Sequence, residues 1–224
     1  MNILITGISK GLGLELASIY ASEGHAVYGV SRTMPNRMVD EVKWHSVDIT
    51  KHSCRSAIHQ FVLDLPHLDL LINNAGCGSS GYQLASVDPI ELETQLALHC
   101  NGPLMITQAV IAKLRRAKHP KIINVTSRFG SIVRHQQGEF ANRDFGYCYS
   151  IGKAAQNMLT ICMQNDTSLS GIIIAAMNPG LLRTDSGAND AKHSAREGAI
   201  AFVRKVEQIN ENGAYHAFGE AATL

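Results

Sequence analysis

The chain has 224 residues, of which 45% are hydrophobic and 17% charged, enough apolar material to bury one substantial core. We therefore predict a single α/β domain that covers residues 1–224. Twenty Lys and Arg residues against nineteen Asp and Glu residues give a net charge of +1, which excludes the strong positive field expected of a protein that binds nucleic acid or anionic membrane.

The sequence contains no pattern typical of a targeting segment or a metal centre. Met1 leads directly into the apolar run Asn2–Ile5, which leaves no room for a signal peptide, so we expect a cytoplasmic protein without membrane contact. The five cysteines are odd in number and form no C-x-x-C pair, and the ten histidines are scattered. We therefore expect reduced thiols and no metal ion.

Strands and helices are predicted to alternate along the whole chain. The first strand, Asn2–Ile5, runs into a glycine-rich turn and a helix near residues 12–20. Further strands are predicted at residues 26–30, 44–47, 68–72, 121–125, 172–176 and 214–218, and further helices at about 51–64, 88–116, 147–168 and 194–209. Apolar strands separated by helices indicate a doubly wound parallel sheet of the Rossmann type, with ligands at the carboxyl ends of the strands.

The turn Thr6-Gly7-Ile8-Ser9-Lys10-Gly11-Leu12-Gly13 has the position of a phosphate site between a strand and a helix. Glycines permit a tight turn and close backbone approach, and the helix N-terminus favours a pyrophosphate. The spacing G-x-x-x-G-x-G differs from the G-x-G-x-x-G of most dinucleotide binders, and glycine also serves ordinary turns and caps. The position of the turn favours nucleotide binding.

Tyr149 and Lys153 stand four residues apart in the segment Tyr149-Ser150-Ile151-Gly152-Lys153, so on a helix they share a face. An ammonium group beside a phenol lowers the pKa of the phenol. Moving that pKa from about 10 to near 7 requires roughly 4 kcal/mol. One charge at about 4 Å, at an effective dielectric constant near 20, supplies roughly that amount. The pair therefore predicts a phenolic acid.

Six segments together resemble the short-chain dehydrogenase/reductase family in type and order, over nearly the whole chain. They are Thr6–Gly13, Asn73–Gly76, Asn101, Ser127, Tyr149 with Lys153, and Asn178–Gly180 followed by Thr184. The compact tail and the stretch before Tyr149 are similar to the small carbonyl-reductase-like branch, which includes the C-factor-like proteins. The resemblance implies hydride transfer between a nicotinamide cofactor and a ketone, aldehyde or quinone, or the corresponding alcohol.

The resemblance also implies roles for four catalytic residues. Tyr149 gives a proton to the carbonyl oxygen, and Ser127 orients that oxygen by a hydrogen bond. Lys153 binds the nicotinamide ribose and lowers the pKa of Tyr149. Asn101 holds a water molecule that reprotonates the site through Lys153.

The end of the second strand predicts the cofactor. An acidic residue here is typical of enzymes that prefer the non-phosphorylated form, whereas this chain has Arg32, and Lys10 can reach the same 2'-phosphate. We therefore predict NADP(H), with two solvated surface cations as the alternative. Asp48 matches the family residue near the adenine amino group, although it can also cap a helix.

The remaining cofactor contacts come from the resemblance alone. Asn74 to Gly76 also stabilise the sheet, and Thr184 could instead cap a helix before Asp185. The implied contacts are Gly7, Ser9, Gly11, Leu12, Gly13, Asn74, Ala75, Gly76, Pro179, Gly180 and Thr184, together with Tyr149 and Lys153.

Three questions stay open at this point. Two functions are possible: an NADPH-dependent reductase, or an NADP(H)-binding regulatory protein of the same fold with little or no turnover. The four intact catalytic residues favour the reductase.

The apolar helices around residues 104–114 and 154–163 predict a homodimer or homotetramer. The long gap of 21 residues between Ser127 and Tyr149 predicts that residues 131–146 form a substrate-specificity loop, with a solvated surface excursion as the alternative.

Overall fold

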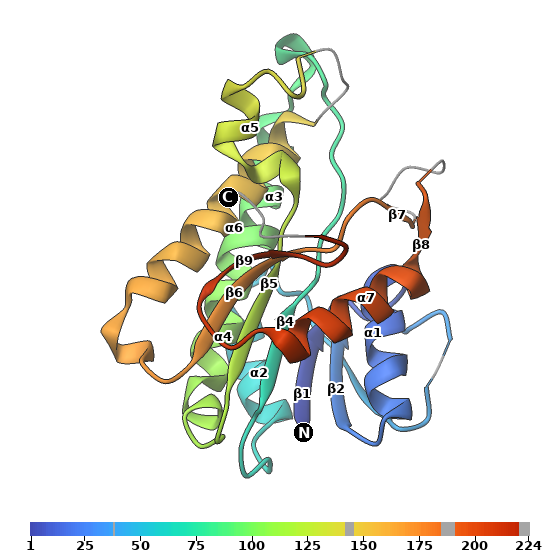
Figure 1. Cartoon of the computed structure of the whole chain (residues 1–224), viewed down its shortest axis with the longest axis vertical. Helices are drawn as coiled ribbons and strands as arrows, with labels where there is room; N and C mark the ends of the chain where they lie inside the picture. Colours follow the sequence, from blue (N-terminus) through green and yellow to red (C-terminus); the bar gives the residue numbers. More distant parts are fainter. Residues whose placement is uncertain (38, 142–145, 185–190, 220–224) are drawn as a thin grey trace.

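The computed structural model describes residues 1–37, 39–141, 146–184 and 191–219 (Figure 1). One sheet of seven parallel strands has the order β3-β2-β1-β4-β5-β6-β9. Its strands are β1 (Asn2–Thr6), β2 (Ala26–Ser31), β3 (Val42–Ser46), β4 (Leu70–Asn73), β5 (Lys121–Val125), β6 (Ile173–Asn178) and β9 (Gly213–His216). The predicted doubly wound sheet, including the final edge strand, is confirmed.

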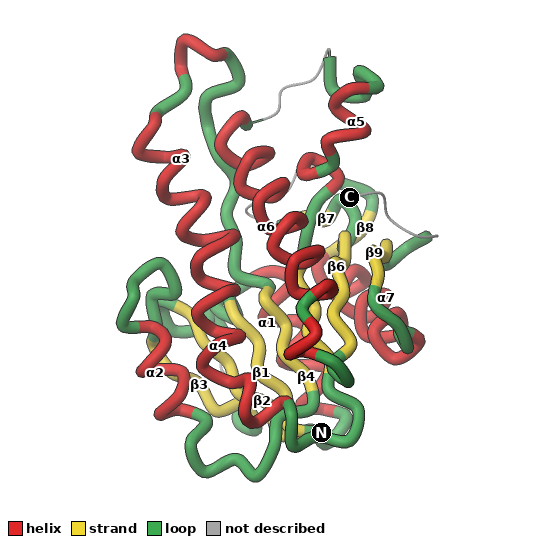
Figure 2. The backbone as a smooth tube through the Cα atoms, turned by 90° about the vertical axis from the view of Figure 1, so that its left-hand side faces the viewer, coloured by secondary structure: helices red, strands yellow, loops and turns green. Residues whose placement is uncertain are grey.

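Helices cover both faces of this sheet (Figure 2). One face carries α1 (Gly11–Ser22) and α7 (Ala195–Gln208), and the other carries α2 (Cys54–Phe61), α4 (Gly102–Leu114) and α6 (Tyr147–Asn165). Successive strand residues point to opposite faces, so Ile3 and Ile5 enter the α1/α7 core while Leu4 enters the α2/α4/α6 core. This alternation explains why the strands read as continuous apolar runs.

The helix predicted at residues 88–116 divides into three parts. They are α3 (Pro89–Leu96), the π-helix η2 (Ala97–Asn101) and α4. Pro103 lacks an N–H to donate to the carbonyl of His99, and its ring crowds that carbonyl, so the α-helical pattern is interrupted just before α4. The interruption changes which side chains of this stretch face α6.

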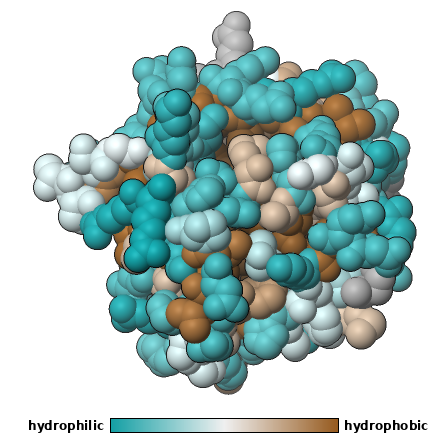
Figure 3. Space-filling view, turned by 90° about the horizontal axis from the view of Figure 1, so that it is seen from below, coloured by the Kyte–Doolittle hydropathy of each residue, from teal (hydrophilic) through white to brown (hydrophobic). Residues whose placement is uncertain are grey.

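Short elements complete the described chain: η1 (Leu84–Ser86), η3 (Arg128–Gly130), α5 (Ile132–Gln136), η4 (Thr167–Leu169), and the paired strands β7 (Leu182–Arg183) and β8 (His193–Ser194). The end of the molecule where β1 begins is largely covered by hydrophilic side chains, with apolar residues between them (Figure 3). None of the described helices combines the length and apolar character needed to cross a membrane.

Candidate active site

The glycine turn lies between β1 and α1, as predicted, and its shape requires glycine. Gly7 and Gly11 have φ values of +76° and +59°, in the left-handed region that glycine alone enters freely. A Cβ atom on Gly7 would lie 2.7 Å from the Cα of Ala75, and one on Gly13 would lie 2.2 Å from the carbonyl oxygen of Gly7. No side chain caps the N-terminus of α1, which begins directly after Lys10. The turn is therefore compact, and its helix N-terminus can face an anion.

The segment after β4 is tied to this turn by hydrogen bonds. The side-chain amide of Asn74 donates to the carbonyl oxygen of Thr6 at 2.9 Å, and the backbone N–H groups of Asn74 and Ala75 donate to the hydroxyl of Thr6 at 3.0 and 2.9 Å. Gly76 follows, with room for no larger residue, because a Cβ there would lie 2.9 Å from the ring of His99. These contacts establish the structural role expected for Asn74 to Gly76.

The residues expected at the adenosine end lie at the end of β2 and in the turn after β3. Arg32 is exposed, and Asp48 accepts hydrogen bonds from the backbone N–H and the hydroxyl of Thr50, at 3.0 and 2.7 Å. Burial alone would raise the pKa of Asp48, but the Thr50 bonds and the charge of Arg32 hold that pKa below its usual value. Asp48 is thus an ionised neighbour of Arg32 as well as the anchor of a turn.

Exposed Lys10 stands at the start of α1, beside Ser9. The backbone N–H of Asn36, in the loop after β2, donates to the carbonyl oxygen of Ser9 at 2.9 Å. This bond joins the segment that follows Arg32 to the glycine turn. The two predicted phosphate cations therefore come from neighbouring segments.

The segment after β6 returns to the glycine turn. Gly180, which follows Pro179, has a φ of +83°, and its N–H donates to the side-chain carbonyl of Asn178 at 3.0 Å. Further along, the methyl group of Thr184 would lie 3.4 Å from a Cβ on Gly11. Thr184 therefore faces the turn that contains Gly11 and Leu12, while Asp185 lies outside the described residues.

Ser127 is held beside Tyr149 by the packing of η3 on α6. The Ser127 side chain lies close enough to the phenol of Tyr149 to lower the pKa of that phenol. A Cβ on Gly130 would lie 2.7 Å from the backbone of Lys153, so glycine permits the close approach of η3. The side-chain amide of Asn157 donates to the carbonyl oxygen of Gly130 at 3.1 Å and fixes the turn on α6.

Tyr149 and Lys153 share one face of α6, as predicted, but the amine does not lie against the phenol. Lys153 Nζ lies 5.8 Å from the centre of the Tyr149 ring. It donates to the carbonyl oxygen of Val125 at 2.6 Å and to the side-chain oxygen of Gln156 at 2.9 Å.

The pKa values of the pair reflect this burial. Burial raises the pKa of Tyr149, which the nearby Ser127 side chain lowers only in part, and burial lowers the pKa of Lys153 to about 7. The lowered phenolic pKa expected from the sequence is therefore not seen in this structure. The amine donates to a backbone oxygen and an amide oxygen rather than to the phenol.

Asn101 is not brought to this cluster. It is exposed at the end of η2, whereas His99, two residues earlier, is fully buried against Tyr149. The centres of the His99 and Tyr149 rings lie 5.6 Å apart, with an angle of 82° between the ring planes. The sequence analysis missed His99 because it assigned this position by motif order; the helix interruption at Pro103 is the signal that could have revealed it.

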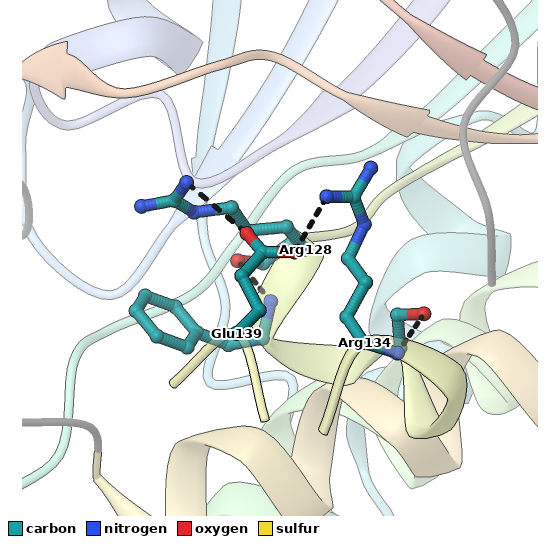
Figure 4. Close-up of polar contacts among 6 residues, drawn as sticks. Arg128, Arg134 and Glu139 are labelled. Carbon is teal, nitrogen blue, oxygen red and sulfur yellow. Dashed lines mark hydrogen bonds and ion pairs between the residues drawn. The ribbon is translucent and has the colours of Figure 1, made fainter. Parts of the chain in front are cut away.

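The first part of the predicted specificity loop folds against the site. Phe140 is only 1% exposed and packs on Phe129, whose ring centre lies 6.4 Å from that of Tyr149. Glu139 accepts from Arg134 at 2.7 Å and from Arg128 at 3.5 Å, and Figure 4 shows both arginines directed toward this carboxylate. Residues 128–141 are thus a packed unit next to Tyr149, while residues 142–145 lie outside the described part.

In the part of the chain that the structure describes, no three His, Cys, Asp or Glu side chains gather as metal ligands. The five cysteines are all unpaired thiols, as expected.

A doubly wound sheet with a glycine turn and a Ser–Tyr–Lys cluster at the carboxyl ends of its strands defines a nucleotide-dependent oxidoreductase. The chain belongs to the short-chain dehydrogenase family, whose model, described as short chain dehydrogenase, matches residues 1–195. Membership means an oxidoreductase with a nicotinamide cofactor. The predicted short-chain dehydrogenase/reductase family is confirmed.

Two relatives share about a third of the aligned residues. The chain is 33% identical to C-signal of Myxococcus xanthus over 144 residues, which cover 64% of this chain and 82% of that protein. It is 36% identical to 3-ketodihydrosphingosine reductase of Bacteroides thetaiotaomicron over 145 residues, which cover 64% of this chain and 53% of that protein.

Two solved structures share the fold at low identity. An NADPH-bound carbonyl reductase from chicken fatty liver matches with a TM-score of 0.88 at 22% identity, over 100% of this chain and 98% of that one. The carbonyl reductase Sniffer of D. melanogaster matches with a TM-score of 0.86 at 24% identity, over 100% and 99% of the two chains.

Proposed function

We propose that this protein is an NADPH-dependent reductase that acts on a ketone, aldehyde or quinone, and in reverse on the corresponding alcohol. The observation that carries the proposal is the position of the Ser127 side chain beside the Tyr149 phenol, next to Lys153 and at the same end of the sheet as the glycine turn. A hydroxyl pair of this kind can hold one carbonyl oxygen from two sides. A protein that only binds a nucleotide has no need of such a pair.

The residues present fit a dinucleotide. Gly7 and Gly13 let the turn pack closely against Asn74, Ala75 and its own backbone, and α1 begins beside them without a side-chain cap, so its N-terminal N–H groups can meet an anion. Thr184 lies against Gly11 from the opposite side. We propose that the pyrophosphate binds at this turn, and that the adenosine lies toward Asp48 and Asn74 to Gly76.

Lys10 and Arg32 support the phosphorylated cofactor. Both side chains are exposed, and the Asn36–Ser9 backbone bond brings their segments together. Arg32 has Asp48 as an acidic neighbour, and Lys10 supplies a second positive charge for a 2'-phosphate. We propose that these two cations favour NADP(H) over NAD(H).

The bound cofactor supplies a hydride to the carbonyl carbon. Ser127 then orients the carbonyl oxygen, and Tyr149 donates its phenolic proton as negative charge develops there. Loss of that proton leaves a phenolate, which an ammonium group on Lys153 stabilises. We propose that Lys153 exchanges its bonds to Val125 and Gln156 for contacts with the cofactor ribose and the phenolate during the reaction.

Residues 128–141 support a role in substrate selection. The segment is anchored by Phe140 and by the bonds of Glu139 to two arginines, and Phe129 contacts Tyr149 edge-on. We propose that it forms one wall of the carbonyl pocket. The burial of Phe140 favours this role over a solvated surface excursion.

The test is the loss of NADPH absorbance with a panel of ketones, aldehydes and quinones, with Tyr149→Phe as the matched variant. This change removes only the hydroxyl, so NADPH binding should survive while turnover falls by a factor of about 10² to 10⁴. Turnover retained in Tyr149→Phe would place the proton donor elsewhere. NADPH binding without turnover of any carbonyl compound would favour the regulatory alternative.

A further inference from the structure

His99 is a buried histidine that the proposed mechanism does not yet use. It lies in the π-helix η2, is 0% exposed, and meets the Tyr149 ring edge-on. Asn101, the residue assigned from motif order, is exposed on the same segment. The interruption before Pro103 thus places an imidazole, rather than an amide, against the catalytic tyrosine.

Two glycines from distant parts of the chain make room for this ring. A Cβ on Gly76, after β4, would lie 2.9 Å from His99 Cε1. A Cβ on Gly152, in α6, would lie 3.2 Å from His99 Cδ2. Any side chain at either position would press on the imidazole. The niche is therefore shaped by the loop after β4 and by α6, and Gln95 of α3 is a third neighbour.

The polar atoms of this niche are not satisfied by the protein. Neither His99 Nδ1 nor His99 Nε2 has a well-formed hydrogen bond among the described residues, and the side-chain oxygen of Gln95 is likewise without one. An unsatisfied buried polar atom costs about 1–3 kcal/mol, so three of them together call for an explanation. A water molecule is the ligand that such a mixed donor and acceptor set fits.

The charges around His99 keep it neutral. Burial, and then the positive charge of Lys153, lower the pKa of His99 well below its ordinary value, and the backbone of Cys77 opposes this only weakly. The titratable groups that face the ring are Tyr149 and Lys153, both from α6, and the loop after β4 brings the backbone of Cys77 to it. A neutral imidazole has one donor and one acceptor, which lets it hold a water molecule without repelling the cation.

We infer that His99, rather than Asn101, is the positioning residue that holds the water through which a proton returns to the Lys153–Tyr149 pair. The inference rests on the proposed function. Each reduction leaves Tyr149 as a phenolate; Lys153 returns a proton to it, the water gives a proton to the Lys153 amine, and solvent restores the water. No bond to carbon changes in these steps, and one proton enters per turnover.

The test separates the first turnover from the following ones. In His99→Phe the first hydride transfer uses the proton already on Tyr149, so its single-turnover rate and the Kd of NADPH should change by less than about twofold. The steady-state kcat should fall by about tenfold or more, with an altered pH profile and a larger solvent isotope effect. His99→Gln, which restores a donor and an acceptor, should recover much of the loss.

The control is His119→Phe, the same change at an exposed histidine before β5, at the opposite end of the sheet. If His99→Phe does not fold, His99→Leu, with a smaller side chain than phenylalanine, takes its place. Equal losses in single-turnover and steady-state rates would mean a merely structural role. Unchanged steady-state turnover, or a loss confined to Asn101→Ala, would also overturn the inference.

A second measurement needs no substrate. In the unliganded protein, the ring nitrogen NMR signals of His99 should show a neutral, hydrogen-bonded imidazole, and they should shift in Lys153→Met. If the signals instead show a ring without hydrogen bonds, and Lys153→Met does not shift them, the inference is overturned. If instead the unmutated protein reduces no carbonyl compound, the proposed function fails while this measurement still decides the state of His99.

Discussion

Lys153 makes the stability of this protein depend on pH in a way that one substitution should remove. Lys153 is 4% exposed, and burial lowers the pKa of its amine from the ordinary 10.5 to about 7. Between these two values the unfolded chain binds a proton that the folded protein does not bind. The free energy of unfolding therefore rises with pH across this window and is flat, for this group, below it.

The size of the effect follows from the two pKa values. One pKa unit corresponds to about 1.4 kcal/mol, so this lysine should contribute a gain of about 3 kcal/mol in the free energy of unfolding between about pH 7 and pH 10. Lys153→Met should lose this gain. The variant also leaves the carbonyl oxygen of Val125 and the side-chain oxygen of Gln156 without their donor. That loss is nearly independent of pH, so it cancels when the two pH values are compared.

The assay is urea unfolding of the unliganded protein and of Lys153→Met at several pH values across this range. Other groups titrate in both proteins and cancel in the difference. Lys118→Met, at an exposed lysine, is the control and should leave the pH dependence unchanged. Equal pH dependence of the unmutated protein and Lys153→Met would refute the view that this amine is buried at a high free-energy cost.

Three further predictions concern the cofactor, the loop and the assembly. NADPH should bind at least about tenfold more tightly than NADH, a difference of about 1.4 kcal/mol, and Arg32→Asp should abolish or reverse this preference; equal Kd values in the unmutated protein would contradict it. Glu139→Ala frees Arg128 and Arg134 from their shared carboxylate, so it should change KM across a carbonyl panel more than the Kd of NADPH, and an unchanged substrate profile would argue against the loop as a pocket wall. The exposed apolar side chains Leu104 of α4 and Met158 of α6 favour a homodimer or homotetramer, which sedimentation should detect; a monomer at micromolar concentration would rule this out.

Local sequence patterns were enough to predict most strands of the sheet and part of the candidate site. The apolar runs predicted six strands of the sheet and the final edge strand, because strands buried on both faces have few polar positions. The glycine turn and the shared face of Tyr149 and Lys153 were also predictable, since both depend on residues within one turn or one helix. Element ends shifted by a few residues, as with β3, where packing decides the last hydrogen bonds.

Only the tertiary structure showed the features that depend on the direction in which a side chain points from its helix and on how deeply it is buried. His99, and not Asn101, faces Tyr149 because a π-helix before Pro103 changes the direction of every side chain in that stretch. Phe140 is buried although it lies in a polar segment, because Phe129 and the bonds of Glu139 fold the chain back. The pKa of Lys153 falls because the surrounding core excludes water from its amine, a property of the whole packed sheet that no local spacing encodes.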